Sequence, residues 1–225
     1  MEHTPVYECR RVPAGSIRID GILDDPGWRD IPLVGDFILS DGSGPATRQT
    51  EARMCWDDDY LYIRFKCDDP DVWGTMLNRD DPVWEEEVVE AFIDPDSDLV
   101  WYYEFQLSPH NVQTDILIHN PTGLRKDLVT DWSWTCEGWL TVVKVDGTLD
   151  NRQDVDIGWT AEWAIPFKSI PGAPNTPPKD GDTWRMNLYR IDRTPDEEFS
   201  CWSPTLEVPP NYHVPVRFGT IVFTG

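Results

Sequence analysis

Short runs in which apolar and polar side chains alternate recur along nearly the whole chain. In YLYIRFKC (60–67), Leu61, Ile63 and Phe65 fall on one face of an extended backbone and the intervening residues on the other. A strand places successive side chains on opposite faces, so this pattern predicts a β-strand with one face in the core. EARMCW (51–56) precedes it with three aspartates between, which predicts a hairpin.

Similar runs, separated by Gly, Pro and Asp clusters, predict roughly eleven strands in all. Besides the hairpin, the segments are 16–21, 87–93, 101–107, 113–118, 131–136, 139–145, 158–165, 183–191, 200–203 and 216–223. Helical periodicity is absent over any long window, and only AIPFKSI (164–170) favours a helical turn. Short strands at fairly even spacing predict an all-β fold, an antiparallel β-sandwich of the jelly-roll or immunoglobulin-like type.

A length of 225 residues suits one large all-β domain, so we predict a single domain over residues 1–225. The Pro-rich loop 172–182 is interpreted as an excursion within that domain, because a strand-like run follows it at once. The five cysteines lack the CxxC spacing of a zinc site, which favours small core residues. No cofactor is therefore required on this reading.

Composition changes the picture in two respects. The 12 tryptophans exceed what core filling usually needs, so some are expected at the surface. A net charge of −22 repels phosphate backbones, anionic membranes and acidic polysaccharides, which excludes nucleic acid and membrane partners and favours a neutral or cationic ligand. The chain has no run of 18 apolar residues and no signal peptide, which predicts a cytoplasmic location, or an extracellular one if an export signal has been removed.

An acidic stretch, DDPVWEEEVVEAFIDPD (80–96), invites a catalytic interpretation first. Glycosidases need two carboxyl groups about 5 to 9.5 Å apart. On a strand, Glu86 and Glu90 would share a face but stand about 13 Å apart, and Glu87 would point the other way from Glu90. A hydrolase would therefore need a partner on the next strand, such as Glu104, and this pairing is kept as an alternative.

The end of the same stretch is the second candidate site. Asp94, Asp96 and Asp98 alternate as calcium ligands often do, although the glycine and the final bidentate acid of an EF-hand loop are missing. An Asp-rich turn between strands is favoured, with a structural calcium ion as the open alternative.

The single tryptophan in the stretch, Trp84, supports a third interpretation. Val89, Ala91 and Ile93 form an apolar row suited to the core, so Glu90 points to the other face. An indole beside a carboxylate and an amide is typical of neutral sugar sites, where the ring stacks on C–H groups and polar side chains bind hydroxyls.

Four features, taken together, resemble the family 9 carbohydrate-binding modules. They are IRIDGILDDPGW (17–28), ARMCWDDDYLYIRFKCDD (52–69), VWEEEVVEAFIDPD (83–96) with YYEFQLSP (102–109), and WTAEWAIPFKSI (159–170) with GDTWRMNLYRIDR (181–193) and RFGTIVF (217–223). The resemblance implies a jelly-roll-like sandwich without catalytic activity that binds sugars, often at chain ends, between two aromatic walls. We further expect a monomer, with a linked or associated glycoside hydrolase as partner.

The resemblance also assigns site residues. Trp84 matches the family's Trp, and Glu90 matches the acid of its VE pair. The polar residue on the family's next strand corresponds to Gln106 or the nearby Glu104, and its later Asn corresponds to Asn187. The chain departs from the family where its second Trp is expected, because Tyr189 and Arg190 stand there. Tyr189 or Trp202 is then the candidate for the second wall, and Arg190 could donate to hydroxyls as a planar fork.

Two further alternatives remain at this point. A related sandwich domain that binds haem would use Met with His or Lys, and the candidate ligands are Met54, Met76, Met186, His110, His119 and His213. A structural domain would instead use exposed tryptophans to pack against an enzyme.

Overall fold

A computed structural model describes residues 4–225 of the chain. It contains thirteen strands, namely β1 (Val6–Arg11), β2 (Ile38–Leu39), β3 (Thr50–Trp56), β4 (Tyr60–Asp68), β5 (Val88–Asp94), β6 (Trp101–Leu107), β7 (Gln113–His119), β8 (Val129–Asp131), β9 (Leu140–Asp146), β10 (Gly158–Pro166), β11 (Thr183–Asp192), β12 (Glu198–Cys201) and β13 (Gly219–Thr224). The helices are single 3-10 turns: η1 (Pro26–Trp28), η2 (Val83–Glu85), η3 (Arg125–Asp127), η4 (Phe167–Ser169) and η5 (Pro215–Arg217). Within the described residues, none is long and apolar enough to cross a membrane.

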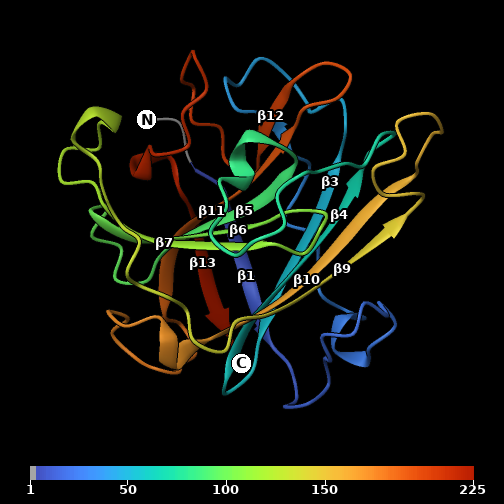
Figure 1. Cartoon of the computed structure of the whole chain (residues 1–225). Coiled ribbons are helices and arrows are strands. Elements are labelled where there is room, and N and C mark those ends of the chain that lie inside the picture. The colour runs from blue at the N-terminus through green and yellow to red at the C-terminus, as the bar shows by residue number, and fades with distance from the viewer. Residues whose placement is uncertain (1–3) are drawn as a thin grey trace.

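The strands form one hydrogen-bonded sheet, with the order β8-β7-β6-β5-β11-β13-β1-β3-β4-β10-β9. The short strand β12 pairs with β11 and with β2 off this path. The sheet curls, as Figure 1 shows. Near its two ends, the Gln113 amide of β7 donates to the Trp139 carbonyl at 3.1 Å and to Thr141 Oγ1 of β9 at 2.9 Å. The all-β prediction is confirmed, whereas the jelly-roll or immunoglobulin-like type stays a prediction.

One strand breaks the antiparallel rule. β1 runs parallel to β13 on one side and to β3 on the other, as the blue strand beside the red one in Figure 1. The purely antiparallel prediction is wrong here, because local alternation carries no information about the direction of a strand's distant neighbours. β1 itself was not predicted, although Tyr7 and Cys9 are buried and its other residues exposed.

Two predicted strands are loops. In 16–21 the Asp25 carboxylate accepts a hydrogen bond from the Arg18 backbone N–H at 3.0 Å, which holds the segment in a turn against η1. In 131–136 only Asp131 is in a strand, residues 132 and 133 form a turn, and 134–136 are irregular. The hairpin β3–β4 and the helical turn η4 are confirmed.

Core residues lie on both faces of β5. Val89, Ala91 and Ile93 belong to the main core inside the curl, as predicted, and Val88 and Phe92 belong to a second cluster on the opposite face. Seven of the twelve tryptophans are buried, whereas Trp101 and Trp132 are 45% and 46% exposed. The prediction that some tryptophans reach the surface is confirmed. All five cysteines are free and buried.

Candidate functional site

A cavity of about 450 Å³ opens over β5, β6 and β7, on the face away from the main core. Its lining comes from these strands and from the chain segments that fold over them: Trp84, Glu90, Phe92, Glu104, Gln106, Ile116, Arg125, Leu128, Thr130, Trp132, Ile191, Arg193, Phe199, Pro210, Asn211, Tyr212 and His213. A volume of this size is ordinary for a small-molecule site, for which about 300 to 1,000 Å³ is typical.

The floor of the cavity is polar and is set by strand register. Glu90 of β5 lies opposite Gln106 of β6, and Phe92 lies opposite Glu104. Because these residues occupy alternate positions, all four point to the same face. The Gln106 amide N–H donates to Glu104, while Gln106 Oε1 is buried with no hydrogen-bond partner among the described residues. A buried acceptor without a partner is unfavourable unless a ligand or water satisfies it.

Burial controls the charge of this floor. It raises the pKa of Glu90 well above its usual range, and the nearby Glu104 carboxyl raises it further. Burial also raises the pKa of Glu104 to about 7, against the opposite effects of the Gln106 hydrogen bond and the Arg125 charge. At pH 7 Glu90 therefore retains its proton and Glu104 is about half protonated, so the floor offers an O–H donor as well as acceptors.

Aromatic side chains form one wall. Trp84 lies in η2, and Trp132 follows β8; their ring centroids are 5.9 Å apart with planes tilted by 43°. The two rings touch each other, so they make a corner beside the floor instead of two parallel walls across a ligand. Trp132 is 46% exposed, which leaves its ring accessible.

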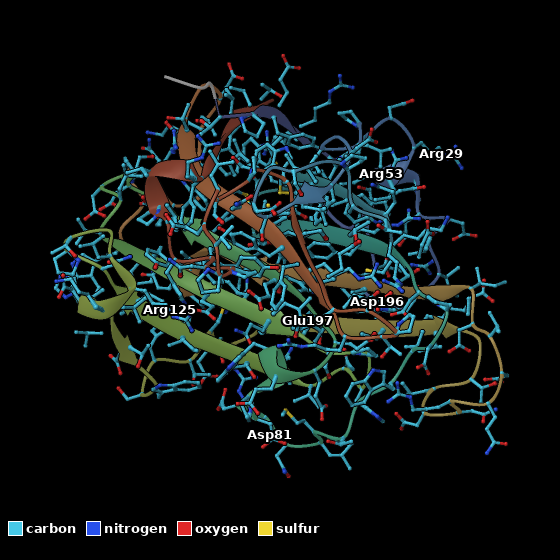
Figure 2. All side chains as sticks on the ribbon, turned by 90° about the horizontal axis from the view of Figure 1, so that it is seen from above. Arg29, Arg53, Asp81, Arg125, Asp196 and Glu197 are labelled. Carbon is cyan, nitrogen blue, oxygen red and sulfur yellow. The ribbon has the colours of Figure 1, made fainter. Side chains whose placement is uncertain are left out.

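A second part of the cavity wall is built around Arg193. Its guanidinium donates to the Trp84 carbonyl at 2.7 Å and lies over the Phe199 ring at 5.1 Å from the centroid. His213 also lines the cavity, with Nδ1 2.9 Å from the Tyr102 hydroxyl and Nε2 3.9 Å from a Glu104 carboxylate oxygen. Burial and the Arg125 charge lower the pKa of His213 to about 3, so this imidazole is neutral in the working pH range. Figure 2 shows Arg125 on the yellow-green segment and Glu197, the ion-pair partner of Arg193, on the orange one.

Four of the eight predicted site residues meet in this cavity: Trp84, Glu90, Glu104 and Gln106. Asn187 and Tyr189 are on the same face of the sheet but fully buried. The Asn187 amide exchanges hydrogen bonds with the Ser203 backbone at 2.8 and 2.9 Å. Tyr189 stacks on Tyr212 at 4.0 Å and donates to its carbonyl, so it supports the wall from behind.

The other two predicted residues lie elsewhere. Arg190 points to the opposite face, where it donates to the Asp68 carbonyl and pairs with Asp69 and Asp192 while only 1% exposed. Trp202 is in the main core, and its indole N–H donates to the Val34 carbonyl at 3.0 Å. The expectation that Arg190 or Trp202 faces the ligand site is therefore wrong, since alternation on β11 and core packing turn them away.

Sequence reasoning missed Arg125, Trp132, Arg193, Phe199 and His213 as lining residues. His213 was considered only as a haem ligand. An exposed Trp132 was detectable as part of the tryptophan surplus, but its segment was read as a strand. For the others the sequence carried no local signal, because Arg125, Arg193 and His213 lie in connections between strands, and Phe199 lies on β12, which pairs off the main strand order.

The geometry of the cavity bears on the hydrolase and haem-binding alternatives. Glu90 and Glu104 both line the cavity, yet they lie on neighbouring strands of one floor and do not flank a ligand from two sides. Of the candidate haem ligands, the described lining includes His213 and no methionine; Met54 and Met186 are in the main core.

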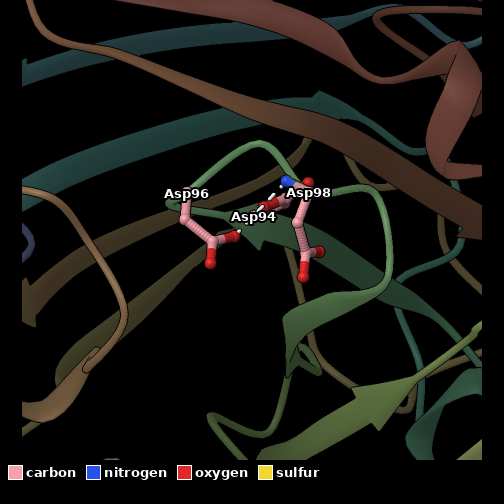
Figure 3. Close-up of side chains that lie close together, drawn as sticks. All are labelled: Asp94, Asp96 and Asp98. Atoms are coloured by element: carbon pink, nitrogen blue, oxygen red, sulfur yellow. Dashed lines mark hydrogen bonds between the residues drawn. The ribbon is translucent and has the colours of Figure 1, made fainter.

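A second group of acids lies in the β5–β6 connection, shown in Figure 3. One carboxylate oxygen from each of Asp94, Asp96 and Asp98 lies within 4.8 Å of the others. Asp94 is fully buried, with Oδ2 accepting from the Leu99 backbone N–H at 2.9 Å and Oδ1 without a hydrogen-bond partner among the described residues. Burial and the two neighbouring acids raise the pKa of Asp94 to about 7. Carboxylate oxygens gathered in this way fit a hard cation such as Ca²⁺.

Comparison with known proteins places this all-β fold in a family. The family model described as "Carbohydrate family 9 binding domain-like" matches residues 19–225. The chain belongs to this family.

Solved structures show the same fold. A putative carbohydrate-binding protein from Bacteroides uniformis is similar with a TM-score of 0.75, 17% identity, and coverage of 98% of this chain and 99% of that one. A family 9 module from Caldicellulosiruptor kristjanssonii in complex with cellotriose has a TM-score of 0.63 at 17% identity, with 98% and 94% covered.

Two curated relatives complete the comparison. An "Extracellular protein" of Arthroderma benhamiae is 27% identical over 184 residues, 78% of each chain. Endo-1,4-beta-xylanase A of Thermotoga maritima is 27% identical over 168 residues, which are 72% of this chain but 13% of the xylanase.

Proposed function

We propose that this chain is a non-catalytic carbohydrate-binding module that holds a neutral sugar in the cavity over β5 and β6. The observation that carries the proposal is the joining, in one cavity, of an accessible tryptophan corner and a buried polar floor. The Trp84 and Trp132 rings would stack on the C–H face of a sugar. Glu90, Glu104 and Gln106 would bind its hydroxyls, and the unpartnered Gln106 oxygen would gain a donor.

The relatives support this reading. Family 9 modules from Caldicellulosiruptor kristjanssonii are described in complex with cellotriose and with glucose, and the Thermotoga maritima relative is a xylanase. We therefore expect a neutral β-linked glucan or xylan fragment as ligand and a glycoside hydrolase as associated partner. The name of the Arthroderma benhamiae relative favours an extracellular location.

Calorimetric titration with glucose, xylose, cellotriose and xylotriose tests the proposal, followed by tryptophan fluorescence. We expect Trp84→Ala and Trp132→Ala each to weaken binding by about tenfold or more, because loss of one stacking ring typically costs about 1 to 3 kcal/mol. Trp101→Ala is the matched control, since Trp101 is equally exposed but stacks on His119 outside the cavity. Equal loss in all three variants, or no binding by any sugar, contradicts the proposal.

Chain-end recognition can be tested on the same protein. The family resemblance implies it, and borohydride reduction opens the terminal ring of cellotriose without changing the other rings. Loss of affinity for the reduced trisaccharide supports binding at the reducing end, whereas unchanged affinity supports internal or non-reducing-end binding.

For the acidic loop we propose a structural calcium ion held by Asp94, Asp96 and Asp98. The buried, unpartnered Asp94 oxygen supports it, because a cation would neutralise a carboxylate that is otherwise costly to ionise. Calcium in excess should raise the melting temperature of the wild-type protein at pH 7.5, and Asp94→Asn should remove this effect. An equal response of both proteins would refute the site.

A further inference from the structure

A second cavity of about 440 Å³ adjoins the first one. Phe199 and Pro210 line both, so the two cavities are neighbours on either side of these two residues. Two other cavities, on the side of the Pro-rich loop, share no lining residue with either. Among these cavities, the one that adjoins the tryptophan-lined cavity is therefore the one beyond Phe199. We name the second cavity the acidic groove.

The base of the acidic groove is well fixed. The Glu198 carboxylate accepts the backbone N–H groups of Thr47 at 2.9 Å and Arg48 at 3.1 Å, which ties the loop after β2 to β12. Arg48 in turn pairs with the buried Asp192 at 3.5 Å and donates to the Asp196 carbonyl at 3.4 Å, so its charge is offset by Asp192. A groove fixed by such contacts is present before any ligand arrives.

The groove carries an excess of negative charge. Five acids line it, namely Asp41, Asp196, Glu197, Glu198 and Glu207, against Arg48, and of these Glu197 pairs with Arg193. Hydrogen bonds from Ser43 lower the pKa of Asp41, which keeps this carboxyl ionised. Asp196 and Glu197 appear side by side at the labelled turn in Figure 2. A carboxylate-bearing ligand would meet this field at short range.

We infer that the acidic groove is a second sugar subsite, which binds the next units of an oligosaccharide whose first unit occupies the tryptophan corner, and which selects uncharged chains over chains that carry uronic acids. This inference rests on the proposed function. The apolar parts of Phe199 and Pro210 provide a surface for sugar C–H groups, and the carboxylates accept from hydroxyls. The same carboxylates repel an acidic substituent.

Amide chemical shifts of the full chain locate the ligand. Glucose or xylose should shift the Trp84 and Trp132 indole N–H signals and the amides of 211–213. The corresponding trisaccharide should shift these and, in addition, the amides of Ser40, Asp41, Thr47 and Val208. The groove is not a subsite if the trisaccharide shifts only the signals that the monosaccharide shifts. The same conclusion follows if its additional shifts fall on the amides of residues 122–126, around Arg125, and not on those of the groove. If none of the sugars shifts the first set, the proposed function itself fails.

Charge selection is tested with the trisaccharide that binds and with a derivative bearing one uronic acid. We expect the acidic derivative to bind about tenfold more weakly at low salt, with a smaller difference at 0.5 M salt because exposed charges are screened there. The double variant Asp196→Asn, Glu207→Gln should reduce the discrimination to about twofold. Asp24→Asn with Asp154→Asn is the matched control, since both are exposed aspartates outside the groove and should leave the discrimination unchanged. Equal affinity of wild type for both sugars overturns the inference.

Discussion

Replacing Glu104 with glutamine should stabilise the protein at alkaline pH while it weakens sugar binding. Glu104 is 5% exposed, and burial raises its pKa from 4.5 to about 7. A carboxyl whose pKa is higher in the folded state gives up stability as pH rises from the unfolded pKa to the folded one. Glutamine has nearly the same shape and no charge, so it removes this penalty.

The size of the effect follows from the shift. One pKa unit corresponds to about 1.4 kcal/mol, so the shift of Glu104 represents about 3 kcal/mol. Below pH 4.5 the carboxyl is protonated in both states, and the variant should match wild type. Between pH 4.5 and 7 the advantage of the variant should grow, and above pH 7 it should reach its full value of about 3 kcal/mol.

Urea unfolding followed by tryptophan fluorescence at pH 4.5, 6 and 8 measures this difference directly. Glu8→Gln is the matched control, because Glu8 is exposed on β1 and should give no pH-dependent change. Glu104→Gln should at the same time weaken sugar binding, since it removes an acceptor from the floor of the cavity. A variant that is no more stable than wild type at pH 8 would refute the reasoning that this acid is kept in the site at a cost to stability.

Three further predictions concern single residues. Gly158→Ala should lower the free energy of unfolding in urea by about 3 kcal/mol or more, because φ of Gly158 is +148° and a Cβ there would lie 1.9 Å from the Cys67 carbonyl oxygen. Gly44→Ala is the control and should be nearly neutral, because the space around Gly44 is open. Arg190→Met should lower the free energy of unfolding by about 3 to 5 kcal/mol at pH 8, because it leaves the buried Asp69 and Asp192 without their ion-pair partner. The loss should be smaller at pH 5, where Asp192, whose pKa is raised to about 6, is protonated. An equal loss at both pH values would contradict this. Arg193→Met should weaken sugar binding in calorimetry by several-fold with little loss of stability, since this guanidinium joins the two walls of the cavity; unchanged affinity would show that the walls hold without it.

Much of the fold was accessible from sequence because alternation reports which face of a strand is buried. For β5 it correctly separated Val89, Ala91 and Ile93 from Glu90, and so it directed Glu90 toward the cavity. It did not reveal the parallel pairing of β1, which depends on partners far away in the chain.

The candidate site was predictable where strands build it and unpredictable where loops do. Trp84, Glu90 and Gln106 were found because two adjacent strands and the turn before them carry these residues. Trp132 stands beside Trp84 only because the connection after β8 folds back over the sheet. Arg190 was misassigned since its neighbour Tyr189 takes the cavity-facing position on β11.

The central position of β1 has a consequence for how the chain reaches its folded state. Cys9 of β1 lies in register with Phe223 of β13, and the Thr224 hydroxyl donates to the Cys9 carbonyl across a separation of 215 residues. The middle of the sheet can therefore close only after β13 has left the ribosome, and until then the edge of β1 that pairs with β13 stays open. Contacts of such long sequence separation slow folding, and an unpaired edge invites aggregation during that delay. Expression at lower temperature or with a chaperone should accordingly raise the soluble yield of this protein.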